Sequence, residues 1–183
     1  VVLQSQPQST VTVTITPNAQ LTVSPSPLSF TSANWNVAQT VTVTAANDVV
    51  VEGNHSGTLG FAVASSDPAY GSVTLPGITA AITDNDSAVV SFAPASVSQS
   101  EATSPMAFTV TLSNPVASGV TASVSTSDGT ATAGADYTAI TAQTVSFAPG
   151  STTAQTVSVV INNDALDEDD ETYTLSLSNL VAT

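Results

Sequence analysis

The chain has 183 residues, contains no Lys, Arg or Cys, and carries a formal net charge of −14. Without basic side chains it cannot neutralise phosphate, which excludes nucleic acid as a partner and argues against binding to anionic membrane surfaces. Without cysteine it has neither disulfides nor thiolate metal sites, so hard cations are the natural counter-species for its acids.

Short segments in which apolar residues alternate with Thr or Ser occur along the whole chain. A period of two, bounded by Pro, Gly, Asn and Asp, predicts short antiparallel strands. In chain order these segments are 10–17, 39–45, 58–64, 78–84, 106–113, 119–126, 155–162 and 172–179. Because no segment shows a helical stripe and polar turns recur about every ten residues, we expect an all-β sandwich or barrel. No stretch is long and apolar enough to insert into a membrane.

The sequence contains an internal repeat. Residues 38–62 align without gaps with residues 154–178, and "LSF" at 28–30 matches "VSF" at 145–147. A repeat of this length indicates two tandem domains rather than a short solenoid. We place the boundary after Asp86, which gives domains at 1–86 and 87–183.

The two predicted domains are out of phase with the repeat. The first lacks an opening strand equivalent to residues 88–101, and the second lacks a closing strand equivalent to residues 77–86. We therefore expect neighbouring repeats of a longer chain, or a strand from another subunit, to complete each sandwich.

An acidic cluster directly precedes the last predicted strand. Six of the eight residues from Asp164 to Glu171 are acidic. Like charges in contact cost free energy and raise pKa values, and Ca²⁺ prefers six to eight oxygen ligands, so a calcium ion would compensate the cluster. The alternative is a solvated acidic turn in a protein from salty water, where salt screens the charges.

Two segments of the second domain resemble the Calx-β domain. They are "STSDGTATAGADYTAI" at 125–140 and "VSFAPGSTTAQTVSVVINNDALDEDDETYTLSLSN" at 145–179. Residues 28–86 look like a divergent relative found in large bacterial surface and adhesion proteins. The resemblance implies two tandem immunoglobulin-like antiparallel β-sandwiches. In calcium-binding members of the family, carboxylates from several loops hold the ions at one end of the sandwich.

Carried over by position, the resemblance implies a set of calcium ligands in the second domain. The candidates and their neighbouring alternates are Glu101, Asp136, Asp164, Asp167, Glu168, Asp169, Asp170 and Glu171. Asp128 of the "SDGTA" turn is assigned to the turn rather than to metal.

The first domain departs from this pattern. Its weaker candidates, matched by the repeat or by the family's closing acids, are Asp48, Glu52, Asp84 and Asp86. Apolar or neutral residues, among them Val51 and Gly53, replace the other acids of the loop. We therefore expect a weaker calcium site there, or none.

The composition also limits the function. With one histidine and no cysteine, the chain cannot form a His-based nucleophile relay or a familiar zinc site, so we expect no enzyme. We expect a non-catalytic structural or adhesive repeat module, extracellular or at the cell surface, in a long surface protein or filament. Calcium at domain ends would rigidify it. Its expected partners are neighbouring copies or repeats of itself, with cell-surface or glycan ligands as further candidates.

Two alternatives remain at this point. One is a filament subunit that polymerises by strand complementation between chains. The other is a carbohydrate-binding module that uses Trp35, Tyr70 and Tyr137 as stacking platforms.

Overall fold

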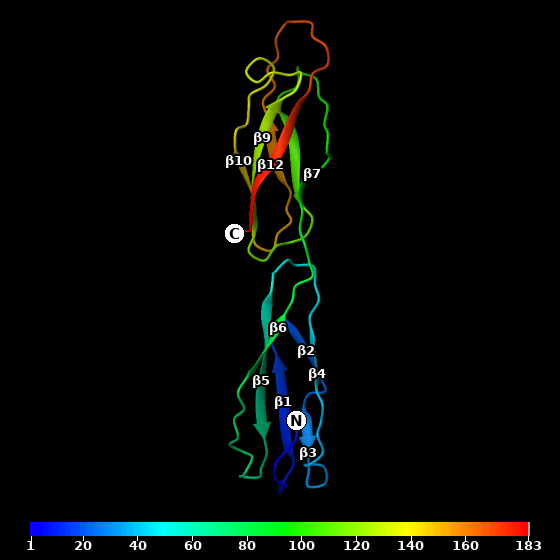
Figure 1. Ribbon diagram of the computed structural model, residues 1–183, viewed down its shortest axis with the longest axis vertical. Helices are drawn as coiled ribbons and strands as arrows, with labels where there is room; N and C mark the ends of the chain where they lie inside the picture. The colour runs from blue at the N-terminus through cyan, green and yellow to red at the C-terminus, as the bar shows by residue number, and fades with distance from the viewer. Residues whose placement is uncertain (183) are drawn as a thin grey trace. The chain divides into compact units, whose positions relative to one another are not determined.

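The computed structural model describes residues 1–182, which form β-strands, turns and loops (Figure 1). The strands within this range are β1 (Val11–Pro17), β2 (Leu21–Ser24), β3 (Leu28–Phe30), β4 (Thr42–Ala45), β5 (His55–Ala64), β6 (Ile78–Ile82), β7 (Val90–Phe92), β8 (Met106–Leu112), β9 (Val120–Asp128), β10 (Gln143–Phe147), β11 (Gln155–Val159) and β12 (Tyr173–Ala182). All paired strands are antiparallel, so the predicted all-β class is confirmed. No helix long and apolar enough to cross a membrane occurs within residues 1–182.

The strands form two compact units. The first contains Val1–Asp48 and Gly53–Asp84, and the second contains Val49–Glu52 together with the chain from Asn85 onward. The short segment belongs to the second unit because the Val51 amide donates to the Pro115 carbonyl at 2.9 Å. Nothing in the sequence predicts this attachment, since it depends on a contact between distant parts of the chain.

The first unit packs a four-stranded sheet, in the order β3-β1-β5-β6, with the pair β2-β4. Alternation along β1 places Val11, Val13 and Ile15 in the core, whereas Thr14 and Thr16 are exposed. The other buried members of this core are Leu21, Leu28, Phe30 and Leu59. Because these residues come from both sheets, the unit is a β-sandwich.

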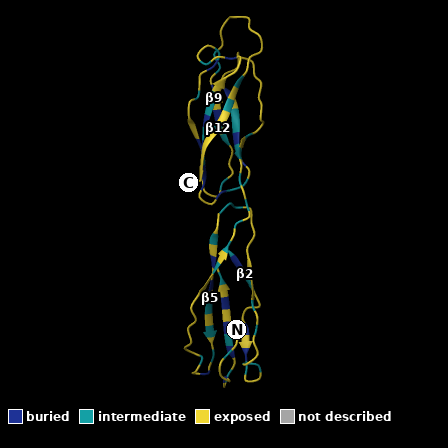
Figure 2. Ribbon diagram, in the orientation of Figure 1, coloured by how far each residue is buried: buried dark blue, intermediate teal, exposed yellow. Residues whose placement is uncertain are grey.

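The second unit consists of two three-stranded sheets, β10-β9-β12 and β11-β8-β7. Its core draws on both sheets and contains Val110, Leu112, Val116, Val120, Ala122, Val124, Val145, Phe147 and Val157. Figure 2 shows the resulting alternation of buried and exposed residues along the strands. Valine dominates because β-branched side chains fit a pleated, half-buried surface.

Each of the eight predicted alternating segments overlaps a strand. Strand β2 was not predicted, because its alternating stretch is too short to establish a period. The repeat is also visible in the sheets: β3, β1 and β5 of the first unit occupy the places of β10, β9 and β12 in the second. The two sheets differ in one respect. Strand β5 lies between β1 and β6, whereas β12 is the last strand of its sheet.

Candidate metal centre

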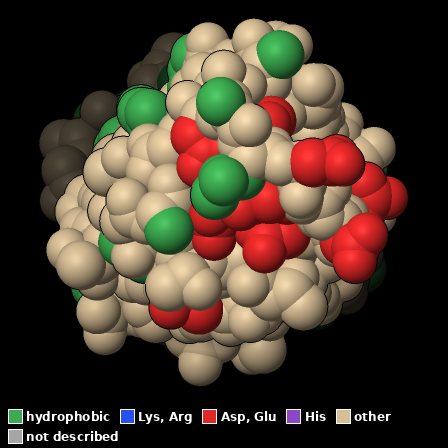
Figure 3. Space-filling view, turned by 90° about the horizontal axis from the view of Figure 1, so that it is seen from above, with side chains coloured by type: hydrophobic (Ala, Val, Ile, Leu, Met, Phe, Trp, Pro, Cys, Tyr) green, Lys and Arg blue, Asp and Glu red, His purple; other side chains and the backbone are tan. Residues whose placement is uncertain are grey.

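Three loops of the second unit meet at one end of its sandwich. They are residues 93–105 between β7 and β8, residues 129–142 between β9 and β10, and residues 160–172 between β11 and β12. Together they line a pocket of about 410 Å³. Figure 3 shows acidic side chains gathered on this face. The sandwich therefore presents its acids on loops that a rigid β-framework positions.

Backbone and side-chain hydrogen bonds fix the position of Asp136 in the β9–β10 loop. Its Oδ2 atom accepts from the Thr132 amide at 2.6 Å, and its own amide donates to the Thr132 carbonyl at 3.0 Å. The Asp136 carbonyl accepts from the Asn162 amide at 2.9 Å, which connects this loop to the β11–β12 loop. Gly134 turns the chain with a φ of +95°, a conformation that favours glycine.

A pair of stacked tyrosines lies beneath this loop. Tyr137 is only 1% exposed, and its ring stacks on Tyr173 with centroids 4.5 Å apart. The Tyr137 hydroxyl donates to Oδ1 of Asp128 at 2.6 Å, and the same atom accepts from the Ala133 amide at 3.0 Å. Burial, followed by the hydrogen bond to Asp128, raises the pKa of Tyr137. Asp128 thus holds the turn together, as its place in the sequence suggested.

Tyr173, the other tyrosine of the pair, follows the acidic loop directly. Its hydroxyl donates to the Met106 sulfur at 3.1 Å, and burial, with Tyr137 nearby, raises its pKa to about 12. The stacking fixes the first residue of β12 against the β9–β10 loop. Glu171 lies two residues before this strand and is thereby brought close to Asp136.

Three carboxylates converge at this point. Asp136, Glu168 and Glu171 each offer an oxygen, and these oxygens all lie within 4.8 Å of one another. Calcium binds oxygens at about 2.4 Å, so two ligands on opposite sides of one ion are separated by up to about 4.8 Å. The spacing and the all-oxygen donor set therefore fit one calcium ion.

The electrostatics of the cluster favour a cation. Loss of hydration raises the pKa of Glu168, and the carboxylates of Asp164, Asp136 and Glu101 raise it further. Loss of hydration also raises the pKa of Glu171, with added contributions from Asp136 and Glu168. The chain has no Lys or Arg to offset these charges. Each acid therefore makes ionisation of its neighbours costlier, and a bound cation would reverse that effect.

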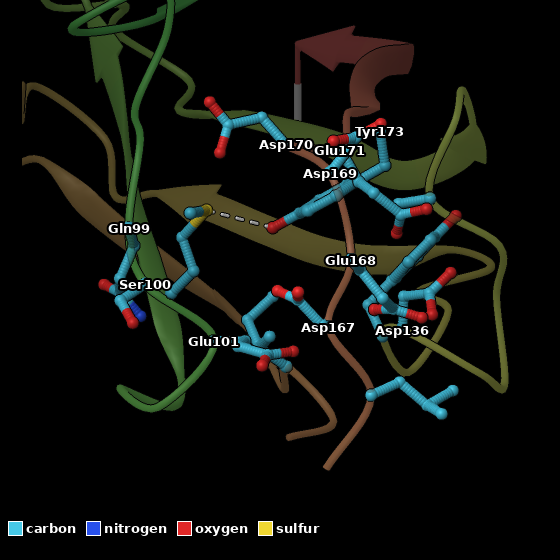
Figure 4. Close-up of a pocket in the computed structure, with 15 residues that line it drawn as sticks. Gln99, Ser100, Glu101, Asp136, Asp167, Glu168, Asp169, Asp170, Glu171 and Tyr173 are labelled. Atoms are coloured by element: carbon cyan, nitrogen blue, oxygen red, sulfur yellow. Dashed lines mark hydrogen bonds between the residues drawn. The ribbon is translucent and has the colours of Figure 1, made fainter. Parts of the chain in front are cut away.

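The pocket gathers seven of the eight acids predicted for the second domain. They are Glu101, Asp136, Asp167, Glu168, Asp169, Asp170 and Glu171. Figure 4 shows Asp136 and Glu168 close together, whereas the carboxylate of Asp170 points away from them. Asp164 does not line the pocket. Its Oδ1 atom accepts from the Leu166 amide at 2.7 Å and so shapes the loop.

The four weaker candidate acids of the first repeat are not members of this group. Asp48 is exposed in the loop between β4 and β5, and Glu52 belongs to the short segment of the second unit. Oδ2 of Asp84 accepts from the Gly53 amide at 2.8 Å, and Asp86 precedes β7. Within residues 1–182, the group with metal-binding spacing contains none of these four acids.

Two further findings concern residues outside the predicted site. Tyr137 cannot serve as a carbohydrate platform because its ring is buried, so that part of the alternative is wrong. Asp67 is a buried acid that sequence reasoning did not place. Its carboxylate accepts from the amides of Gln8 and Ala69 at 2.7 and 2.9 Å, which gives it a structural role in the first unit. No sequence signal predicts it, because Gln8 is distant in the chain.

Comparison with known proteins identifies the second repeat. The sequence model of the Calx-beta domain matches residues 83–183. A search of curated proteins gave no match. Among solved structures, the chain is similar to an apo-form Calx CBD1 domain, with 24% identity, a TM-score of 0.49, and coverage of 51% of this chain and 81% of that one.

Two two-domain structures are also similar to the chain. One is CBD12 from CALX1.2, with 14% identity, a TM-score of 0.45, and coverage of 100% of this chain and 73% of that one. The other is the calcium binding domain CBD12 of CALX1.1, with 15% identity, a TM-score of 0.47, and coverage of 96% and 69%.

Proposed function

The chain belongs to the Calx-β domain family, and from this premise we propose that it is a non-catalytic repeat module whose second unit binds calcium at its acidic end. The observation that carries the proposal is the convergence of Asp136, Glu168 and Glu171, whose carboxylate oxygens lie within 4.8 Å of one another. Glu101, Asp167 and Asp169 line the same pocket and are available as further oxygen ligands.

The residues of the site explain how binding changes the module. Calcium, when bound, supplies two positive charges and positions for six to eight oxygens. Loss of hydration and the neighbouring carboxylates raise the pKa values of Glu168 and Glu171, and the charges of the ion would let both stay ionised beside Asp136. Asp136 is already fixed by Thr132 and Asn162, so it provides the anchored carboxylate of the site. The β11–β12 loop would then be tied to the β9–β10 loop.

This tie would stiffen one end of the sandwich. The β11–β12 loop contains exposed acids throughout, and only local hydrogen bonds such as that from Leu166 to Asp164 order its middle. Ligands that bind only the folded state stabilise it by mass action, by about 2.7 kcal/mol at a hundredfold excess over Kd. A module of this kind is suited to a mechanical role rather than to catalysis.

The cellular setting forms the finer part of the proposal. We propose that the chain is part of an extracellular or surface-exposed repeat array with structural or adhesive function. Support comes from the tandem repeat, from the absence of cysteine and basic residues, and from the resemblance of the first domain to repeats of bacterial surface proteins. Its partners in this proposal are neighbouring repeats of the same kind.

Calcium titration calorimetry of the 183-residue chain tests the proposal. Asp136→Asn removes the charge of the anchored carboxylate, and we expect calcium affinity to fall by at least about tenfold. Asp170→Asn is the matched control, because it makes the same charge change in the β11–β12 loop at a carboxylate that points away from Asp136 and Glu168 (Figure 4). Equal losses in both variants would show only a general charge effect and would contradict the proposed site.

A further inference from the structure

Met106 holds the single sulfur atom of the chain, which has one methionine and no cysteine. It is the first residue of β8 and pairs with Val159 of β11. Its side chain is 7% exposed and lines the acidic pocket together with Glu101, Asp136 and Glu171. A thioether is a side-chain group that oxidants convert reversibly from apolar to polar. The one such group of this chain therefore lies in the wall of the candidate metal centre.

The Met106 sulfur is the hydrogen-bond acceptor of Tyr173. The Tyr173 hydroxyl donates to it at 3.1 Å, which is the dashed line in Figure 4. Tyr137 stacks on the same ring with centroids 4.5 Å apart, and Phe108 meets it edge to face at 6.2 Å. Because a thioether is a weak acceptor, the contact depends on packing that brings sulfur and hydroxyl together. Met106 thus completes the surroundings of the residue that follows the acidic loop.

Oxidation would replace this weak acceptor by a polar sulfoxide. Hydrogen peroxide transfers one oxygen atom to the sulfur: an S–O bond forms, the O–O bond breaks, and the proton of the transferred oxygen passes to the leaving oxygen, which departs as water. The sulfur loses two electrons and the peroxide gains them. Since hydrogen peroxide is uncharged, the carboxylates of the pocket do not repel it as they repel an anionic oxidant.

The sulfoxide oxygen does not fit the packing around Met106. An oxygen directed at Tyr173 would enter the 3.1 Å between sulfur and hydroxyl and push the ring away. An oxygen directed elsewhere would face the carboxylates or the apolar side chains of the same pocket, such as Ile161, and would be repelled or left unpaired. The response in each case is a movement of Met106 or Tyr173 that breaks their present contact.

We propose that Met106 is an oxidation site, and that its sulfoxide displaces Tyr173 and so weakens the calcium site. Tyr173 is a positioning residue, because its ring stacks on Tyr137, which directly follows Asp136. It also lies two residues after Glu171. Displacement of the ring therefore separates Glu171 from Asp136, whose oxygens lie within 4.8 Å. The effect on calcium rests on the proposed function, whereas the oxidation and the movement of Tyr173 do not.

The test treats the folded 183-residue chain with hydrogen peroxide and locates the added oxygen by peptide mass spectrometry. Calorimetry before and after treatment should show calcium affinity falling by about tenfold or more, the usual loss when a residue behind a metal ligand is disturbed. Methionine sulfoxide reductases for both epimers should restore the affinity, because they reverse this modification alone. Restoration excludes damage to Trp35 or to the tyrosines as the cause.

Two variants separate Met106 from oxidation in general. Met106→Leu conserves volume and cannot form a sulfoxide, so we expect its calcium affinity to be the same before and after peroxide. In the double variant Met106→Leu/Leu180→Met, the one methionine occupies an exposed position of β12 that does not line the pocket. This chain should gain one oxygen with peroxide yet keep its calcium affinity within about twofold, as expected for a change at an exposed site.

The movement of Tyr173 is measured in chelator, without calcium. Near-ultraviolet circular dichroism follows the stacked pair of Tyr137 and Tyr173, and we expect the oxidised chain to lose part of this signal. Hydrogen exchange should become faster at the Ala131 amide, which donates to the carbonyl of the neighbouring Thr172 at 3.0 Å. Met106→Leu should show neither change on peroxide treatment.

Three results would overturn the proposal. One is a Met106 side chain that peroxide leaves unoxidised in the folded chain. Another is an oxidised chain with an unchanged tyrosine signal and unchanged exchange at Ala131. A third is calcium affinity that stays the same or rises on oxidation, a rise meaning that the sulfoxide oxygen acts as a ligand. If Met106 is oxidised and Tyr173 moves, but calorimetry detects no calcium binding before or after, the oxidation site stands and the proposed function is contradicted.

Discussion

The two repeats share their strands but differ in the loop that precedes the last long strand of each. Before β5 the loop contains Val51, Gly53 and Asn54, and before β12 the aligned positions contain Asp167, Asp169 and Asp170. The first loop donates a backbone hydrogen bond to Asp84 through Gly53, whereas the second lines an acidic pocket. The same framework can thus carry either a neutral turn or a concentrated negative charge.

The difference extends to a second loop. Asp136 lies between β9 and β10, while the corresponding residues 18–27 between β1 and β3 contain no acid and include β2. A calcium site needs carboxylates from both loops, so the first repeat lacks two parts of it. Strands tolerate such divergence because their apolar faces alone specify the sandwich.

The largest expected effect comes from giving the second repeat the loop of the first. In a variant with Asp167→Val, Asp169→Gly, Asp170→Asn and Glu171→His, we expect the stabilisation by calcium, about 2.7 kcal/mol at a hundredfold excess over Kd, to disappear. Urea unfolding with and without calcium measures it. A variant that keeps the full calcium effect would show that the loop acids are not ligands.

The next largest effect is expected where the two sheets of the first unit pack closely, at Gly57 of β5 and Leu21 of β2. A Cβ atom at Gly57 would lie 2.4 Å from Cγ of the buried Leu21, so Gly57→Ala must displace that side chain. We expect the first unit to lose about 1–3 kcal/mol, the usual cost of overpacking. Trp35, the one tryptophan of the chain, reports this unit by fluorescence. Unchanged unfolding of that signal would contradict the packing described.

A smaller loss of stability is expected from a change at the stacked tyrosines of the second unit. Tyr137→Phe keeps the ring stacked on Tyr173 but removes the hydrogen bond to Asp128. We expect the unfolding free energy of the second unit to fall by about 1–2 kcal/mol. The loss stays small because Asp128 still accepts a hydrogen bond from the Ala133 amide. Urea unfolding followed by circular dichroism measures the loss. A shift in the unfolding followed by Trp35 fluorescence would instead place the loss in the first unit and contradict this account.

The smallest effect compares Asp48 with its repeat equivalent, Asp164. The negative charge of Asp164 raises the pKa of Glu168, so it acts electrostatically on the candidate metal centre. Asp48 lies in the first unit. We expect Asp48→Asn to change calcium affinity by less than about twofold and Asp164→Asn to weaken it several-fold. The reverse order in calorimetry would assign calcium to the first repeat.

The strands were predictable from the sequence because alternation of Val or Ile with Thr or Ser is a local signal. The acidic loop was equally visible, and the family resemblance connected Asp136 to it although 28 residues separate Asp136 from Asp164. The sequence could not show which oxygens converge. That depends on the stack of Tyr137 on Tyr173 and on the bond from Asn162 to Asp136, contacts formed only when distant segments pack.

Thermal unfolding of the 183-residue chain at low ionic strength, with calcium and with chelator, tests the central claim most directly. Trp35 fluorescence follows the first unit, and circular dichroism follows both. At a hundredfold excess of calcium over Kd, the second unit should melt roughly 10–20 °C higher than in chelator, with the Trp35 transition unmoved. Transitions that are identical in the two buffers would contradict a calcium site at Asp136, Glu168 and Glu171.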